Sequence, residues 1–246
     1  MAPLVATVTA AGGRYDCAAP NVHTLRKITL TQVQKDALID GYEGRTAEMK
    51  RSLSTMVDSL PQANADLCPY CCLDQNPDLD HFLPKARFPE FSLHARNLLP
   101  ICTHCNRKKS SVVRTRNDRS RVILNPSFEP SIRQPILQAS LNYAQGKPYV
   151  TYQIDDAGLL SAAERAVALC HFDRLGLPQR YRKRAHGYLG ALKESLSGVT
   201  QSVGRQSFRN EIGGSLLGEP INGWKPALFR AINANPSPLE AWVLPP

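Results

Sequence analysis

The chain has 246 residues, with 30 lysines and arginines against 21 acidic residues, so its formal net charge is +9. This length can bury the core of one or two domains. The positive charge favours a polyanionic partner such as nucleic acid. No apolar run approaches the roughly 18 residues of a membrane span, and the N-terminus lacks the basic residues of a signal peptide. Composition therefore argues against a membrane protein and predicts a cytoplasmic location.

The N-terminal region predicts an arm followed by helices. Residues 1–29 are rich in Ala, Thr, Gly and Pro without periodicity, so we expect an extended arm that can add a short strand. Thr31 and Gln34 form a capping-box pair, which predicts the start of a helix. The apolar spacing over 49–60 predicts a second helix that ends at Pro61 and packs its apolar face against the next region.

Two Cys-x-x-Cys pairs follow, Cys68/Cys71 and Cys102/Cys105. Each such turn presents two thiolates together, and zinc takes four of them in a tetrahedron. An odd total of seven cysteines with this paired spacing favours metal thiolates in a reducing compartment over a disulfide framework. We therefore predict a structural Zn²⁺ site. Cys72 adjoins the first pair, but its spacing favours Cys71 as the ligand.

Between and just after the cysteine pairs lie the groups needed for a nuclease site. Asp80-His81 offers a carboxylate and an imidazole, and Asn97 and Asn106 offer carboxamides. Carboxylate and amide oxygens suit Mg²⁺, and a neutral imidazole can take a proton from water near pH 7. Regular alternation in a strand would point Asp80 and His81 to opposite faces, so we expect a twist or bulge there.

This order of residues resembles the HNH endonucleases, the ββα-metal type with a structural zinc. The matching elements are CPYC, DHFLP ending at Pro84, Asn97-Leu98, and CTHCN followed by basic residues. The resemblance implies an α+β fold with a ββα-metal HNH centre, which we place inside a mostly helical frame. The predicted division is an N-terminal arm and helical region at 1–62, the nuclease domain at 63–125, and a mainly helical C-terminal region at 126–246.

The resemblance also implies a role for each residue of the centre. His81 is expected to act as the general base, and Asp80 and Asn106 to bind Mg²⁺ or another divalent cation. Asn97 is expected to hydrogen-bond the loop backbone and hold His81 in place. Asn97 could also be an ordinary N-cap of a helix that begins near Leu98, and the two roles are compatible.

Basic residues near the centre are candidate nucleic-acid contacts. They are Arg107, Lys108 and Lys109, then Arg114, Arg116, Arg119 and Arg121, and a separate cluster of Arg180, Arg182, Lys183 and Arg184. The basic groups at 114–121 and 180–184 can each bind the phosphate backbone. The alternative interpretation is that their side chains only face solvent.

The C-terminal region mixes strand and helix signals. The run 122–124 predicts a strand after a mobile loop, and residues 149–154 alternate like a strand. Residues 199–220 favour neither helix nor loop. Helices are expected at 161–174, where Ser161 and Glu164 form a capping box, from Pro178 to Leu196, and at 227–232 before a Pro-rich tail.

These observations predict a metal-dependent HNH endonuclease that hydrolyses phosphodiester bonds in DNA. The alternative is a non-catalytic zinc-knuckle module that only binds nucleic acid. Such a module needs none of Asp80, His81 and Asn106, so their joint presence favours the enzyme. The wording DHFLPK…FPEFS…NLLPIC is similar to HNH proteins of bacterial anti-phage systems, the Septu- and retron-associated types. That similarity implies a phage-defence effector with a partner ATPase.

Overall fold

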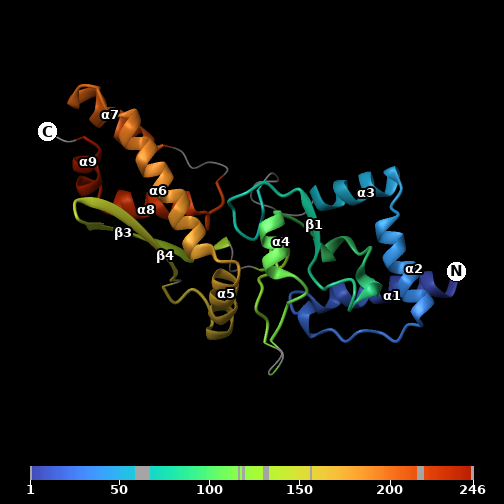
Figure 1. The fold of residues 1–246 in the computed structure, drawn as a ribbon. Helices are drawn as coiled ribbons and strands as arrows, with labels where there is room; N and C mark the ends of the chain where they lie inside the picture. The colour runs from blue at the N-terminus through green and yellow to red at the C-terminus, as the bar shows by residue number, and fades with distance from the viewer. Residues whose placement is uncertain are drawn as a thin grey trace. The chain divides into compact units, whose positions relative to one another are not determined.

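The computed structural model describes residues 2–58, 67–115, 117, 120–129, 133–155, 157–214 and 219–244. The chain divides into two compact units: Met1–Tyr70 with Asp74–Glu129, and Cys71–Leu73 with Pro130–Pro246. Each unit combines helices with a two-stranded antiparallel sheet (Figure 1), which confirms the α+β prediction. The domain boundaries expected after residues 62 and 125 stay a prediction.

The first unit opens with helix α1 (Ala2–Ala18), so the expected extended arm is wrong over this stretch. Tyr15 explains the difference. Its ring is fully buried and lies 5.1 Å from the ring of Phe91, centroid to centroid. Tertiary packing of this kind overrides a weak local pattern.

The next two helices follow the sequence signals. Helix α2 (Gln32–Glu43) begins after Thr31, whose side chain forms the predicted capping box with Gln34. Helix α3 spans Ala47–Asp58, as the apolar spacing predicted. Leu60 and Pro61, and the apolar side chains expected to pack from this helix, lie outside the described residues.

The centre of the first unit has the order strand, strand, helix. Strands β1 (Asp78–His81) and β2 (Leu98–Ile101) are antiparallel, and helix α4 (Thr103–Lys109) lies beside β1 (Figure 1). Short 3₁₀ turns occur at Val22–Thr24 (η1), Pro89–Phe91 (η2) and Ala95–Asn97 (η3). The β1–β2 register is continuous, so the expected bulge is not needed in this ladder. Leu98 begins a strand and not a helix, which corrects the capping interpretation of Asn97.

The apolar run 122–124 is buried, but it does not form the expected strand. The described residues nearby contribute an isolated bridge between Arg114 and Arg121 instead. Burial inside the first unit removes these side chains from water, so the apolar run does not require strand pairing.

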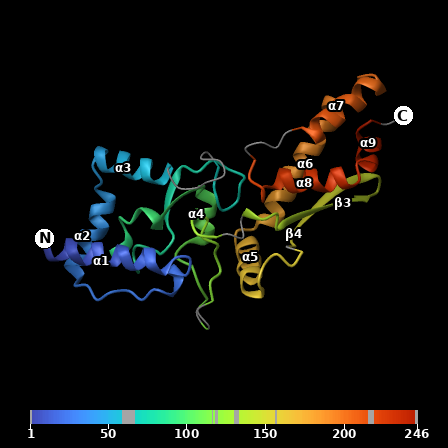
Figure 2. The ribbon, with the colours of Figure 1, turned by 180° about the vertical axis from the view of Figure 1, so that it is seen from behind.

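The second unit is built on a hairpin of β3 (Leu137–Ala144) and β4 (Lys147–Ile154). Gln145 and Gly146 connect the strands with φ values of 51° and 70°, as a tight hairpin turn requires. Strand β4 confirms the prediction for 149–154, whereas β3 was not predicted. Helix α8 packs on β3 and helix α6 packs on β4, as Figures 1 and 2 show from opposite sides.

The C-terminal helices were predicted in part. Helix α5 (Ala162–Arg174), with its Ser161–Glu164 capping box, and helix α6 (Leu177–Ser195) confirm the predictions. Helix α8 (Trp224–Ala234) contains the expected 227–232 segment, and α7 (Gln201–Gly213) occupies the unassigned stretch. Helix α9 (Ser237–Val243) replaces part of the expected Pro-rich tail, because a proline in the first turn is compatible with a helix.

None of the helices in the described part of the chain is long and apolar enough to cross a membrane.

Candidate functional site

The four cysteines of the two Cys-x-x-Cys pairs come together as predicted. All four are buried, and their sulfur atoms lie within 4.8 Å of one another. Tetrahedral zinc with Zn–S bonds of about 2.3 Å separates its sulfurs by about 3.8 Å, so this cluster fits a structural Zn²⁺. Cys72 lies outside the cluster, and burial raises the pKa of its thiol to about 12. None of the seven cysteines, all of which are described, forms a disulfide.

Local hydrogen bonds shape the two cysteine turns. In the first turn, the Cys68 backbone N–H donates to the Asp74 carbonyl at 2.8 Å. In the second, Cys102 caps α4, and its Sγ accepts the Cys105 N–H at 3.4 Å. Helix α4 therefore begins directly after a cysteine of the cluster, which links the cluster to this helix.

Segment Cys71–Leu73 belongs to the second unit, where helix α6 contacts it. The Tyr181 hydroxyl donates to the Cys71 carbonyl at 2.9 Å, and Arg180 Nη2 lies 3.4 Å from Cys71 Sγ. A guanidinium near a sulfur favours its thiolate form. Arg180, expected to contact phosphate or solvent, lies beside a cysteine of the cluster.

Asp80 lies beside the last turn of α4, where Lys109 pairs with it. Lys109 Nζ is 2.7 Å from Asp80 Oδ2 and donates to the His81 backbone carbonyl at 2.8 Å. The Lys109 side chain has an exposed fraction of 0 %. This corrects the expectation that Lys109 contacts nucleic acid, because a fully enclosed ammonium cannot reach a phosphate in this structure.

Burial disfavours the charged forms of Asp80 and Lys109, and the attraction between the two charges opposes this effect. Burial raises the pKa of Asp80, and the neighbouring Lys109 ammonium opposes that rise. Burial also lowers the pKa of Lys109, and Asp80 opposes that fall. Removing one member of such a buried pair typically destabilises a protein by about 3–5 kcal/mol. Each charge therefore depends on the other.

Asn106 contacts a carboxylate that was not predicted as part of the centre. Its Nδ2 donates to Asp78 Oδ2 at 3.0 Å. Asp78 and Asp80 are two residues apart in β1, so they lie on the same side of the strand. Two carboxylates and a carboxamide thus come from β1 and the neighbouring helix, and hard oxygen donors of this kind suit a divalent cation such as Mg²⁺. The spacing Asp-x-Asp in a strand was the signal for Asp78, which sequence reasoning missed.

His81 has its own surroundings. Its Nε2 lies 2.9 Å from the Ser92 carbonyl oxygen, and its ring centroid lies 4.3 Å from that of Tyr42. A carbonyl only accepts hydrogen bonds, so Nε2 carries the proton and Nδ1 keeps its lone pair. Burial lowers the pKa of His81 to about 4, assisted by positive charges including Lys85. The imidazole is therefore neutral near pH 7.

Asn97 fastens the loop that follows His81. This fully buried side chain accepts the Leu83 N–H at 2.7 Å and donates to the carbonyls of Leu83 and Phe91, each at 3.1 Å. The Tyr15 hydroxyl also donates to Asn97 Oδ1 at 3.2 Å. The expected contact between Asn97 and the loop backbone is present. Tyr15 and Ser92 were not predicted as supports, because each comes from a segment with no local signal for the site.

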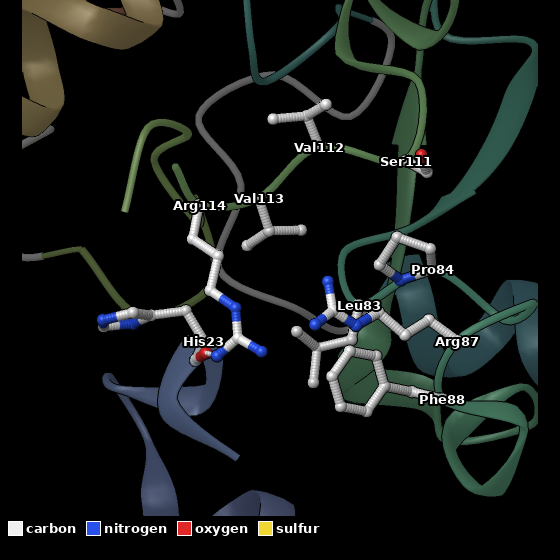
Figure 3. Close-up of a pocket in the computed structure, with 9 residues that line it drawn as sticks. All are labelled: His23, Leu83, Pro84, Arg87, Phe88, Ser111, Val112, Val113 and Arg114. Carbon is white, nitrogen blue, oxygen red and sulfur yellow. Dashed lines mark hydrogen bonds between the residues drawn. The ribbon is translucent and has the colours of Figure 1, made fainter. Parts of the chain in front are cut away.

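A cavity of about 220 Å³ adjoins the segments that follow His81 and α4. Figure 3 shows His23 and Arg114 on one side, and Pro84, Arg87 and Phe88 on the other. Pockets for drug-sized ligands are typically about 300–1,000 Å³, so this one is small. Its lining does not include the Asp80-His81 pair, and the chemistry of the centre therefore lies elsewhere.

The other basic candidates differ in their exposure and contacts. Arg107 and Lys108 are exposed on α4. Arg114 Nη1 donates to the His23 carbonyl at 2.8 Å, and Arg121 pairs with Glu129. Exposed members of the second cluster are Arg182, Lys183 and Arg184 on α6. Arg116 and Arg119 lie outside the described residues.

The chain is similar in sequence to protein ea31 of Escherichia phage lambda, with 28% identity over 162 residues, which are 65% of this chain and 53% of ea31. It is also similar to Septu protein PtuB of Bacillus thuringiensis, with 36% identity over 76 residues, which are 29% of this chain and 28% of PtuB. The chain thus spans about half of ea31 and little more than a quarter of PtuB. No family model and no solved structure matches it.

Proposed function

We propose that the chain is a metal-dependent HNH-type endonuclease that hydrolyses phosphodiester bonds in DNA. The state of His81 carries this proposal. Its Nε2 proton is committed to the Ser92 carbonyl, and its Nδ1 lone pair belongs to a neutral imidazole. Such a group can take a proton from an attacking water. The buried cysteine cluster supports the same proposal, because it fits the structural zinc of this type of nuclease.

Asp80 and Asn106 are the proposed ligands of the catalytic cation, and their oxygens suit Mg²⁺. When bound, a divalent cation neutralises charge on the phosphate and stabilises the leaving oxygen. Asn97 has a supporting part, since its hydrogen bonds hold the loop after His81. Arg107 and Lys108 are the exposed side chains of the centre that we propose for contacts with flanking phosphates.

The proposed biological role is phage defence in the cytoplasm, beside a partner ATPase. Similarity to a Septu protein supports this role, together with the wording of the motif. Because the matched segment is 29% of the chain, the partner and the DNA target belong to the proposal alone.

A cleavage assay tests the function. Purified full-length protein is incubated with plasmid, single-stranded DNA and RNA, in Mg²⁺, in Mn²⁺ and in a mild chelator that leaves zinc bound. We expect divalent-dependent cleavage of DNA, and a rate lower by about 10²–10⁴-fold for His81→Ala, the usual range for loss of a general base. The zinc content of the variant should match that of the wild type.

Two results would change the conclusion. Wild-type-like cleavage by His81→Ala would remove this residue from the mechanism. Binding of nucleic acid without cleavage under every metal condition would favour the zinc-knuckle binding module.

A further inference from the structure

We propose that Lys109 is a positioning residue of the nuclease centre, which orients the Asp80 carboxylate for a divalent cation and fixes the backbone at His81. The inference rests on the proposed function, because it assigns Asp80 to the catalytic cation. It goes further by giving a role to a lysine that sequence reasoning placed on the phosphate backbone.

The first support is the burial of the lysine. Lysine is almost never fully buried unless it is paired, and Lys109 has an exposed fraction of 0 %. An ammonium has three donors. Two contacts hold it here, an ion pair at 2.7 Å with Asp80 Oδ2 and a hydrogen bond at 2.8 Å to the His81 carbonyl. Both contacts lie on the two adjacent residues that the mechanism requires.

The second support is the arrangement of α4 against β1. Residues three apart on a helix lie on the same side, as do residues two apart in a strand. Asn106 contacts Asp78, and Lys109 contacts Asp80. The helix therefore makes two successive polar links to one side of the strand, and the Lys109 link is the one that reaches the catalytic pair.

The chemical consequence concerns the two oxygens of Asp80. A carboxylate can accept at both oxygens. With Lys109 at Oδ2, the rotamer of the side chain is held, and the cation would bind at Oδ1. Partners that orient a metal ligand typically change metal affinity or activity by about 10–100-fold when they are removed.

The experiment compares Lys109→Met with Lys108→Met in the full-length, zinc-loaded protein. Lys108 is the matched control, because it is the neighbouring lysine on the same helix and is exposed. The readouts are Mn²⁺ affinity by calorimetry, zinc content, thermal melting, and the Mg²⁺ dependence of cleavage. We expect Lys109→Met to bind Mn²⁺ about 10–100-fold more weakly. Lys108→Met keeps the Lys109–Asp80 contact, so it should bind Mn²⁺ as the wild type does.

Cleavage by Lys109→Met should shift to higher Mg²⁺ concentrations and recover in part when Mg²⁺ is in excess. A purely structural role for Lys109 would lower the melting temperature without moving this dependence. Lys109→Gln provides a second test if the Met variant does not fold, because its amide keeps a donor beside Asp80. It should retain zinc and still bind Mn²⁺ more weakly than Lys108→Gln.

The outcomes separate the two proposals. Unchanged Mn²⁺ affinity in the folded Lys109 variants, with wild-type cleavage intact, overturns the positioning role and leaves the nuclease standing. Tighter Mn²⁺ binding in those variants also overturns it, because the ammonium would then compete with the cation. Weaker Mn²⁺ binding in a protein whose wild type cleaves no nucleic acid supports the positioning role and rejects the proposed function.

Discussion

The cysteine cluster and the Asp80-His81 pair belong to the same motif, but they are assembled in different ways. The cluster collects four like side chains from two short turns, and all its sulfurs are buried together. Asp80 and His81 are adjacent in the sequence and have different partners, Lys109 for one and the Ser92 carbonyl for the other. The cluster therefore depends on two local turns, whereas the Asp80-His81 pair depends on side chains brought from separate segments.

This difference implies that the cysteine cluster and the Asp80-His81 pair have different roles. Zinc thiolate sites contribute folding free energy directly, so the cluster is expected to support the fold. The groups around β1 are expected to support chemistry. Asn97 is expected to contribute to both, because it stabilises the loop after His81 through its hydrogen bonds to Leu83 and Phe91. Four predictions test this comparison.

The largest effect is expected from Cys105→Ser. This change removes one of four thiolates, and the variant should lose its zinc and the folded state of the first unit, because metal binding and folding are coupled. Zinc analysis and circular dichroism measure both. Cys72→Ser is the matched control, since Cys72 lies outside the cluster and should be replaceable with zinc retained. A folded Cys105→Ser protein with about one zinc per chain would contradict the structural role.

A smaller loss of stability is expected from Asn97→Ala. The change leaves buried backbone groups of Leu83 and Phe91 without their partner, and each such group typically costs about 1–3 kcal/mol. The free energy of unfolding should therefore fall by at least about 2 kcal/mol, with zinc retained. Tyr15→Phe is a milder variant, which removes only a hydroxyl contact and should cost about 1 kcal/mol. Equal stability of Asn97→Ala and wild type in denaturant titrations would show that the loop needs no such fastening.

The pH dependence of cleavage tests the other side of the comparison. Because the pKa of His81 is lowered to about 4, its imidazole stays neutral as the pH falls from 7 through 6.5. The acid limb of kcat/KM should therefore lie near pH 4, below which the rate falls about tenfold for each pH unit. Single-turnover rates from pH 3.5 to 8 measure this limb, with zinc content checked at each pH. An acid limb at pH 6–7 would mean that His81 titrates as an exposed histidine.

The smallest effect is expected from the exposed basic residues. Replacing Arg107 and Lys108 with Gln should weaken DNA binding for all sequences. On duplex DNA, the log–log salt slope should fall by up to about 0.9 for each phosphate that the variant no longer neutralises. The matched change of Arg182 and Lys183 on α6 should have less effect. Filter-binding or fluorescence titrations at several salt concentrations give both slopes. A reduced slope only in the α6 variant would move the binding surface to the second unit.

The features that depend on short-range chemistry could be predicted from the amino-acid sequence. The four clustered cysteines were predicted from two Cys-x-x-Cys turns, and both capping boxes were predicted from residues three apart. The α+β class followed from the same local signals and from the resemblance of the motif. Each capping box, and each Cys-x-x-Cys turn by itself, requires hydrogen bonds or ligands within a few residues, which a sequence pattern records directly.

The partners of the central side chains depend on the three-dimensional packing and could not be predicted from local patterns. Lys109 contacts a residue pair 28 and 29 positions away, and its basic neighbours Arg107 and Lys108 remain exposed, although all three look alike in sequence. Helix α1 likewise lacked a local signal and is supported by Tyr15, whose hydroxyl reaches Asn97 across 82 residues. Which lysine is enclosed, and which carboxylate it meets, depends on how a helix packs on a strand. That packing depends on burial and long-range hydrogen bonds, and short sequence patterns do not record these.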